Sequence, residues 1–387
     1  MSTSNPFAAV PRPDKPLSRY RILSPNAGVH VSPLQVGAMS IGDKWEKLGL
    51  GSMNKESSFK LLDAYYEAGG NFIDTASNYQ DESSEEFIGE WMEKRGIRDQ
   101  MVIATKYSTN YKRGADDIPI KINYVGNNHK SMRISIEESL KKLRTTYIDI
   151  FYVHWWAFDT SVEEVMNCLH NLVTSGKVLY LGVSDTPAWI VSKANQWARD
   201  HGKTPFCIYQ GRWNILDRSL EREIIPMARD QGLALAPWSV LAGGRIRSSE
   251  EEKRREESGE GGRTFLHNDW KRNETEIKVS KKLEEIAKQV GVKSVTAVAI
   301  AYLMHKTAYV FPIVGGRKVE QLEANIQAID IRLSPEQIKA IESVVSFNPG
   351  FPSDMIGDGI NNNFLLRNAG WVDRWQPVSP QPVSSEN

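Results

Sequence analysis

The chain lacks most of the features that mark secreted, membrane-bound or nucleic-acid-binding proteins. It contains only two cysteines, Cys168 and Cys207, and they form no metal-binding or disulfide pattern. The chain has 48 basic residues (Lys and Arg) and 48 acidic residues (Asp and Glu). It therefore has no excess positive charge to attract nucleic acid or an anionic membrane. These absences predict a cytoplasmic protein with no nucleic-acid partner, no membrane partner and no metal.

Long apolar segments and one common nucleotide-binding motif are also missing. The longest apolar run, Val295–Met304, is shorter than the roughly 20 residues that a bilayer-spanning helix needs. The first twenty residues lack the apolar core of a signal peptide. Gly37–Gly42, after the first candidate strand, does not match the glycine fingerprint of a doubly wound dinucleotide-binding fold, which disfavours that fold.

The chain does contain a regular alternation of strand and helix patterns. Apolar strand patterns begin near Leu34, Asn71, Met101, Ile148, Val178, Phe206, Leu233 and Tyr309. Amphipathic helix patterns between them cover Lys55–Ala68, Ser84–Lys94, Met132–Leu143, Val162–Thr174, Ala188–Asp200 and Glu221–Asp230. Strands and helices that alternate in this way, with eight strands, predict an α/β fold of the (β/α)8 TIM-barrel type.

We expect three parts along the chain. Residues 1–18 form a flexible N-terminal arm, residues 19–345 form the barrel, and residues 346–387 form a tail that packs over the barrel or covers its site. The barrel domain opens with a β-hairpin, because strand patterns at Arg19–Leu23 and His30–Ser32 flank a turn rich in Pro, Asn and Gly.

Two connections are long enough to be functional, residues 107–130 and 241–271. The second contains the charge run Glu250–Glu257, which we interpret as a solvated helical turn. Loops after the last two strands of a barrel commonly hold phosphate. Ser83 and Glu86 have capping-box spacing at the start of the second helix.

Three strand patterns end, one after another, in an ionisable residue. These residues are Asp74, Lys106 and His154, and Tyr79 lies five residues beyond Asp74. Each residue alone has an ordinary structural explanation, such as loop capping or core packing. Because the carboxyl ends of barrel strands meet at one face, however, we expect all four side chains to lie close together there.

These four residue types suit the reduction of a carbonyl group. Negative charge grows on the oxygen as hydride reaches the carbon, so a general acid must supply a proton. We expect Tyr79 to be that acid and the Lys106 ammonium to lower the pKa of its phenol. Asp74 would pair with Lys106, and His154 would orient the carbonyl. Trp45, Tyr107 and Trp155 flank these positions and predict an aromatic substrate pocket.

Several motifs resemble the aldo-keto reductase signature, in the expected order and over about residues 20–345. They are Gly69–Ala76 followed by Tyr79, Ile103–Lys106, Tyr152–Trp155, Gly176–Val178 with Gly182–Ser184, and Val314–Arg317 with Asn325. Within that family, Gly37–Trp45 and Phe311–Lys318 resemble fungal aryl-alcohol dehydrogenases and norsolorinic acid reductases.

The resemblance implies Asp74, Tyr79, Lys106 and His154 as a catalytic tetrad, and NADPH bound in extended form across the barrel mouth. The implied cofactor contacts are Ser184, Asp185, Gln210, Trp238, Ser239, Leu241, Gly243, Gly315, Arg317, Lys318, Gln321 and Asn325. Among them, Arg317 and Lys318 would face the 2′-phosphate. Asp185 stands where the family more often has Asn, and a carboxylate cannot donate to the nicotinamide carboxamide oxygen.

We therefore predict an NADPH-dependent oxidoreductase that reduces aromatic aldehydes reversibly to aryl alcohols. Three alternatives remain open: a polyketide aryl ketone reductase of the same branch, a nicotinamide-sensing regulatory subunit like those of potassium channels, and a Schiff-base lyase that uses Lys106. The predicted partner is a small aromatic carbonyl compound. The oligomeric state, monomer or weak dimer, is left open.

Overall fold

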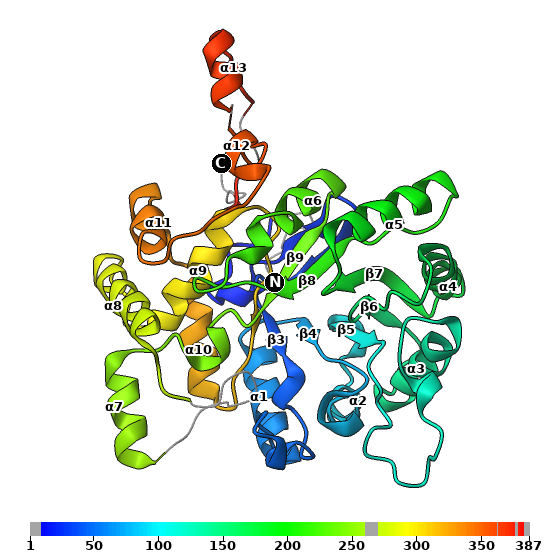
Figure 1. The fold of residues 1–387 in the computed structure, drawn as a ribbon. Helices are drawn as coiled ribbons and strands as arrows, with labels where there is room; N and C mark the ends of the chain where they lie inside the picture. The colour runs from blue at the N-terminus through cyan, green and yellow to red at the C-terminus, as the bar shows by residue number, and fades with distance from the viewer. Residues whose placement is uncertain (1–8, 260–269, 362, 376–377, 383–387) are drawn as a thin grey trace, which may run out of the picture.

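The computed structural model describes residues 9–259, 270–361, 363–375 and 378–382. Helices surround a ring of strands (Figure 1). The strands are β1 Arg21–Ser24, β2 Ala27–Val31, β3 Gln35–Gly37, β4 Phe72–Asp74, β5 Val102–Tyr107, β6 Ile148–Val153, β7 Val178–Ser184, β8 Ile208–Arg212, β9 Ala234–Trp238 and β10 Ile313–Val314. The α-helices are α1 Lys55–Glu67, α2 Ser83–Arg95, α3 His129–Lys142, α4 Val162–Thr174, α5 Ala188–Asp200, α6 Ile224–Gln231, α7 Ser249–Ser258, α8 Glu274–Gln289, α9 Val295–Lys306, α10 Val319–Ile326, α11 Pro335–Glu342, α12 Ser353–Ile356 and α13 Phe364–Ala369.

The eight strands β3 to β10 form one parallel sheet that closes on itself. Their spatial order is β10-β3-β4-β5-β6-β7-β8-β9. The chain before β10 completes the ring, because the Leu235 N–H donates to the Tyr309 carbonyl at 2.9 Å and the Phe311 N–H donates to the Leu235 carbonyl at 2.8 Å. The predicted (β/α)8 barrel is confirmed.

The N-terminal hairpin closes one end of this barrel. Strands β1 and β2 pair antiparallel, as predicted from the sequence. Leu23, Ala27 and Val31 are buried against inward-facing side chains near the strand starts, such as Phe72 and Phe311. The hairpin therefore covers the end where the strands begin and leaves the carboxyl ends of the strands as the open mouth.

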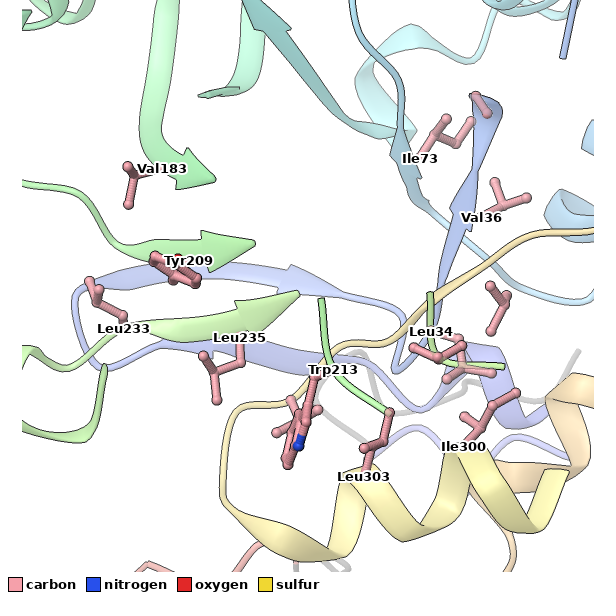
Figure 2. Close-up of a cluster of buried hydrophobic side chains, with 14 of the residues drawn as sticks. Leu34, Val36, Ile73, Val183, Tyr209, Trp213, Leu233, Leu235, Ile300 and Leu303 are labelled. Carbon is pink, nitrogen blue, oxygen red and sulfur yellow. The ribbon is translucent and has the colours of Figure 1, made fainter. Parts of the chain in front are cut away.

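A second apolar layer lies between the outer face of the sheet and the helices. Outward-facing residues such as Val36, Ile73 and Leu235 belong to it (Figure 2). From the helix side, Ile300 and Leu303 of α9 contribute to the same layer. In the described ranges, no helix is long and apolar enough to cross a bilayer.

Two local expectations had different outcomes. The charge run forms α7, which is a largely exposed helix as expected. The capping box at Ser83 and Glu86 was wrong, since the N-cap of α2 is Glu82 and no side chain caps it. The Ser83 hydroxyl instead donates to the Gln80 carbonyl at 3.0 Å, which ties the start of α2 to the loop after β4.

In the part of the tail that the structure describes, no segment covers the mouth. It lies along the flank of the barrel, where the Arg222 side chain donates to the Asn348 carbonyl at 3.1 Å. Further along, Arg229 near the end of α6 donates to the Asp358 carbonyl at 2.9 Å, and Gln381 donates to the Met304 carbonyl near the end of α9 at 3.0 Å. These helix ends are at the hairpin side of the barrel, and α13 stands clear of it (Figure 1). The expectation that the tail packs over the barrel or covers its site stays a prediction, and the contacts described here lie on the flank. Residues 1–8 of the expected arm lie outside the described residues, while Leu17 at its other end is buried.

The contact between α2 and the end of α3 gives a stability prediction. A Cβ at Gly89 would lie 2.2 Å from the Lys142 carbonyl oxygen and 2.7 Å from the Leu143 backbone. Gly89→Ala should therefore lower the free energy of unfolding by about 1–3 kcal/mol through overpacking, although alanine favours a helix by about 1 kcal/mol. Urea unfolding measures this effect.

Gly28→Ala is the matched control, because a Cβ at that exposed position would meet no atom within 4 Å. If Gly89→Ala were as stable as the unsubstituted chain, α2 and α3 could not approach each other as described.

Candidate active site at the barrel mouth

The mouth is lined by the inward-facing residue near the carboxyl end of each strand. Along β5, Val102 and Ala104 face the barrel interior, so the alternation of strand side chains also places Lys106 there. The same alternation turns Ile103 and Tyr107 toward the helices. The sheet register therefore decides which of the predicted residues can meet.

Lys106 and Asp74 form a buried ion pair at the centre of the mouth. The Lys106 ammonium donates to both carboxylate oxygens of Asp74, at 2.7 and 2.8 Å, and to the Thr75 carbonyl at 2.7 Å. The Gln210 amide of β8 also donates to Asp74, at 2.8 Å. Burial lowers the pKa of Lys106, but Asp74 and Tyr79 together raise it above its usual value, so the ammonium stays charged.

Tyr79 lies over this ion pair. Its ring centroid is 5.0 Å from the Lys106 ammonium nitrogen and 5.9 Å from the His154 ring centroid, with an edge-to-face arrangement in the second case. Burial raises the pKa of Tyr79 above 10, and the opposing effect of Lys106 is smaller. Lys106 lowers this pKa, as expected, but burial outweighs it, so the phenol remains protonated at neutral pH.

An unusual backbone segment holds Tyr79 in place. Gln80, Asp81 and Glu82 all have positive φ, at 54°, 44° and 83°. The Gln80 amide then links this segment to the loop after β3, because it donates to the Met39 and Gly51 carbonyls at 2.8 Å each. The sequence analysis missed Gln80, and no local pattern marks it.

Lys142 of α3 binds the backbone of the loop before Tyr79. Its ammonium donates to the Ser77 carbonyl at 3.1 Å and pairs with Glu82 and Glu85 at 3.1 and 2.9 Å. Burial lowers the pKa of Lys142, but the two carboxylates raise it above its usual value. Lys142 was also missed, since an amphipathic helix pattern does not show which lysine turns inward.

His154 follows β6 and is partly buried beside Tyr79. Its Nδ1 lies 3.3 Å from the Thr109 hydroxyl oxygen. Burial, with a smaller contribution from Lys106, holds the pKa of His154 well below 6.5. The imidazole is therefore neutral at neutral pH, and can donate a hydrogen bond but not act as a cation.

The three predicted pocket aromatics do not lie together. The Trp45 ring meets the Tyr79 ring edge-to-face at 6.1 Å, and Trp155 lies beside His154, where its indole donates to Thr109 at 3.0 Å. Tyr107 instead faces the helix layer, fully buried and stacked on Phe151 at 5.4 Å. Tyr107 is therefore left out of the pocket, because it follows Lys106 directly and a strand turns adjacent side chains to opposite faces.

The residues expected at the nicotinamide end lie around one carboxylate. Asp185 accepts from the Ser184 hydroxyl at 3.0 Å and from the Trp238 indole at 3.3 Å. The Gln210 NH2 group donates to Asp74 at 2.8 Å, which ties this residue to the ion pair. The three strands β7, β8 and β9 thus bring these four residues to one side of the mouth.

The residues expected at the phosphate end lie on the loops after β9 and β10. Ser239, Leu241 and Gly243 follow β9, and a Cβ at Gly243 or at Gly315 would meet no atom within 4 Å. Open space beside exposed backbone fits a pyrophosphate, so this part of the mouth suits a dinucleotide.

Beyond Gly315, the chain enters α10 with Lys318 as its N-cap. Arg317 is exposed and lies near Gly51, and its backbone N–H donates to the Gln321 amide oxygen at 3.0 Å. Asn325 is buried and accepts from the Thr296 hydroxyl at 2.9 Å. The Arg317 side chain is thus open to solvent beside the loop after β10, whereas the Asn325 oxygen is already engaged inside the protein.

A parallel barrel whose mouth joins a lysine–carboxylate pair, a protonated phenol and a neutral imidazole is suited to proton transfer at a carbonyl or alcohol oxygen. Comparison with known proteins makes the class specific. The Aldo/keto reductase family model matches residues 33–346, and the chain belongs to that family.

Three relatives show what the chain is similar to. An aryl-alcohol dehydrogenase [NADP(+)] of Phanerodontia chrysosporium is 63% identical over 97% of this chain and 100% of its own length. A putative aryl-alcohol dehydrogenase of Saccharomyces cerevisiae is 54% identical over 91% of this chain and 93% of its own length. The norsolorinic acid reductase stcV of Emericella nidulans is 50% identical over 89% of this chain and 87% of its own length.

The placement of Arg317 leads to a cofactor prediction. Arg317→Ala should weaken NADPH binding at least tenfold and change NADH binding little, because only NADPH carries the 2′-phosphate and a charge-assisted hydrogen bond contributes about 1.5–3 kcal/mol. Fluorescence titration with each nucleotide gives the two Kd values.

Arg199→Ala is the control, since Arg199 is exposed at the end of α5 on the opposite side of the barrel. An equal loss for NADPH and NADH would mean that Arg317 supports the fold and not the phosphate.

Proposed function

We propose that this chain catalyses the NADPH-dependent reduction of aromatic aldehydes to aryl alcohols, and the reverse oxidation. One observation carries the proposal: Tyr79 lies over the charged Lys106–Asp74 pair, with Trp45 at its edge. The name of the Phanerodontia chrysosporium relative, similar along its whole length, supports both the substrate class and the cofactor. The proposed location is cytoplasmic, in line with two free buried cysteines.

The proposed cofactor site is the set of residues from Ser184 to Asn325 described above, which lie at the ends of β7, β8 and β9, on the loops after β9 and β10, and on α10. NADPH supplies the hydride when it is bound there. The chain's own residues bind and protonate the oxygen of the substrate. Tyr79 Oη gives its proton to that oxygen as negative charge grows on it, and the nearby Lys106 ammonium stabilises the phenolate that results.

His154 has a different task in this proposal. Because its pKa is held well below 6.5, the imidazole is neutral at neutral pH and does not act as the general acid. Its imidazole N–H donates a hydrogen bond to the carbonyl oxygen and so orients the carbonyl toward Tyr79. Tyr79 thus transfers the proton, and His154 positions the carbonyl oxygen that accepts it.

The contacts of Lys106 argue against the Schiff-base alternative. A lysine nucleophile must be a neutral amine, and such lysines have lowered pKa values. Here Asp74 and Tyr79 outweigh the effect of burial and raise the pKa of Lys106, and its N–H groups bind Asp74 and Thr75. A polyketide ketone reductase remains a second candidate, because norsolorinic acid reductases are also similar along most of this chain.

The central test of the proposal is Tyr79→Phe. Removal of the phenolic hydroxyl should reduce turnover of an aryl aldehyde by about 10²–10⁴-fold, the usual contribution of a general acid, while NADPH still binds. Steady-state consumption of NADPH and a fluorescence Kd measure the two effects.

Tyr107→Phe is the matched control, because it removes the same group from a tyrosine buried outside the mouth. Near-normal turnover by Tyr79→Phe would assign the proton to another group. Absence of turnover in the unsubstituted chain with a range of aryl aldehydes would favour a regulatory subunit that binds nicotinamide.

The aromatic surroundings of the mouth lead to a substrate ranking. Trp45 and Trp155 favour a flat ring through stacking or edge contacts, each contributing about 0.5–1.5 kcal/mol beyond area burial. A methoxylated benzaldehyde should therefore have a far higher kcat/KM than glyceraldehyde or glucose. Parallel assays of NADPH consumption test this, and a ranking with either sugar first would contradict the aryl assignment while leaving the reductase assignment intact.

A further inference from the structure

We propose that Thr109 is a positioning residue that sets the tautomer of His154, so that Nε2 carries the imidazole proton and faces the substrate oxygen. The inference deepens the proposed function, because it explains how a neutral histidine comes to present an N–H group and not a lone pair. Thr109 belongs to none of the motifs that the sequence analysis identified.

Thr109 lies just beyond the end of β5, in a tightly held turn. Its neighbour Ser108 has a positive φ of 90° and is fully buried. The Ser108 hydroxyl oxygen accepts from the Asn127 amide at 2.8 Å and from the His154 backbone N–H at 3.3 Å. These bonds connect the end of β5 to the end of β6 and hold Thr109 beside the imidazole.

The polarity of the hydrogen bonds follows from the partners of the Thr109 hydroxyl, whose hydrogen has no acceptor among the described residues other than His154 Nδ1. An indole N–H can only donate, so at 3.0 Å it occupies one lone pair of the Thr109 oxygen. Among the described residues, the other partner of that oxygen is His154 Nδ1, at 3.3 Å. If the Thr109 hydroxyl donates to Nδ1, all three groups are satisfied by a single chain of hydrogen bonds from Trp155 through Thr109 to His154.

A donated bond at Nδ1 has a direct consequence for the other ring nitrogen. A neutral imidazole carries one proton, and a nitrogen that accepts a hydrogen bond cannot also bear it. The proton must then be on Nε2, which has no hydrogen-bond partner among the described residues. With the opposite tautomer, Nε2 would turn a lone pair toward the carbonyl oxygen, and the two would repel each other.

Nitrogen-15 NMR of histidine-labelled protein, without cofactor or substrate, tests the proposal directly. The chain has seven histidines, and the spectrum of His154→Asn assigns the signal of interest. We expect His154 to give the shifts of an unprotonated Nδ1 and a protonated Nε2 at neutral pH. A protonated Nδ1 in the unsubstituted chain would overturn the proposal without any substituted protein.

Thr109→Val then removes the hydroxyl while keeping the side chain's shape. We expect the His154 shifts to move toward a mixture of tautomers and kcat with an aryl aldehyde to fall roughly three- to tenfold, as for the loss of one neutral hydrogen bond. The Kd of NADPH should not change. Thr109→Ser keeps the hydroxyl and should restore both the shifts and the rate.

Two outcomes distinguish a positioning role of Thr109 from a role in supporting the fold. Unchanged His154 shifts in Thr109→Val, or failure of Thr109→Ser to restore the rate, would overturn the proposal. Because the NMR experiment needs no turnover, its result is independent of whether Tyr79→Phe supports the proposed function.

Discussion

The rest of the mouth depends on the buried ion pair between Lys106 and Asp74. A buried ion pair is tolerated only when the other hydrogen-bonding capacity of both groups is also met, because desolvation of each charge costs several kcal/mol. Here the lysine also binds the Thr75 carbonyl, and the carboxylate also binds the Gln210 amide. The ion pair can therefore form only when β4, β5 and β8 have their observed register. The catalytic residues are thus brought together only when the barrel is closed.

Burial sets the protonation states of Tyr79 and His154, and the charge of Lys106 acts on both. Burial raises the pKa of Tyr79 and lowers that of His154, and in each case the neutral form is favoured. Lys106 acts on both, opposing the shift at Tyr79 and adding to the shift at His154. The result is a protonated phenol and a neutral imidazole beside a permanent cation, a combination that can give a proton to an oxygen and stabilise the product anion.

Much of this arrangement could be predicted from the sequence, because it follows from short-range patterns. Eight apolar runs predicted the eight barrel strands, and an ionisable residue at the end of three of them indicated Asp74, Lys106 and His154. The error at Tyr107 was avoidable, since adjacent residues of a strand face opposite ways.

Gln80, Lys142 and Thr109 could not be predicted in this way. Each acts through a partner far along the chain, as Gln80 does with Met39 and Thr109 with His154, and no spacing rule connects such positions. The tail likewise has no periodicity that shows which face of the barrel it follows. Sequence patterns therefore indicated the elements and the reacting groups, whereas the bonds that orient those groups required the folded chain.

A crystal structure of the protein with NADP⁺ and an unreactive aryl carbonyl compound would test the central claim most directly. The account predicts the carbonyl oxygen within hydrogen-bond distance of both Tyr79 Oη and His154 Nε2, with the Lys106–Asp74 pair intact and the dinucleotide along the loops after β7, β9 and β10. A carbonyl bound away from Tyr79, or a covalent bond between the ligand and Lys106, would contradict it.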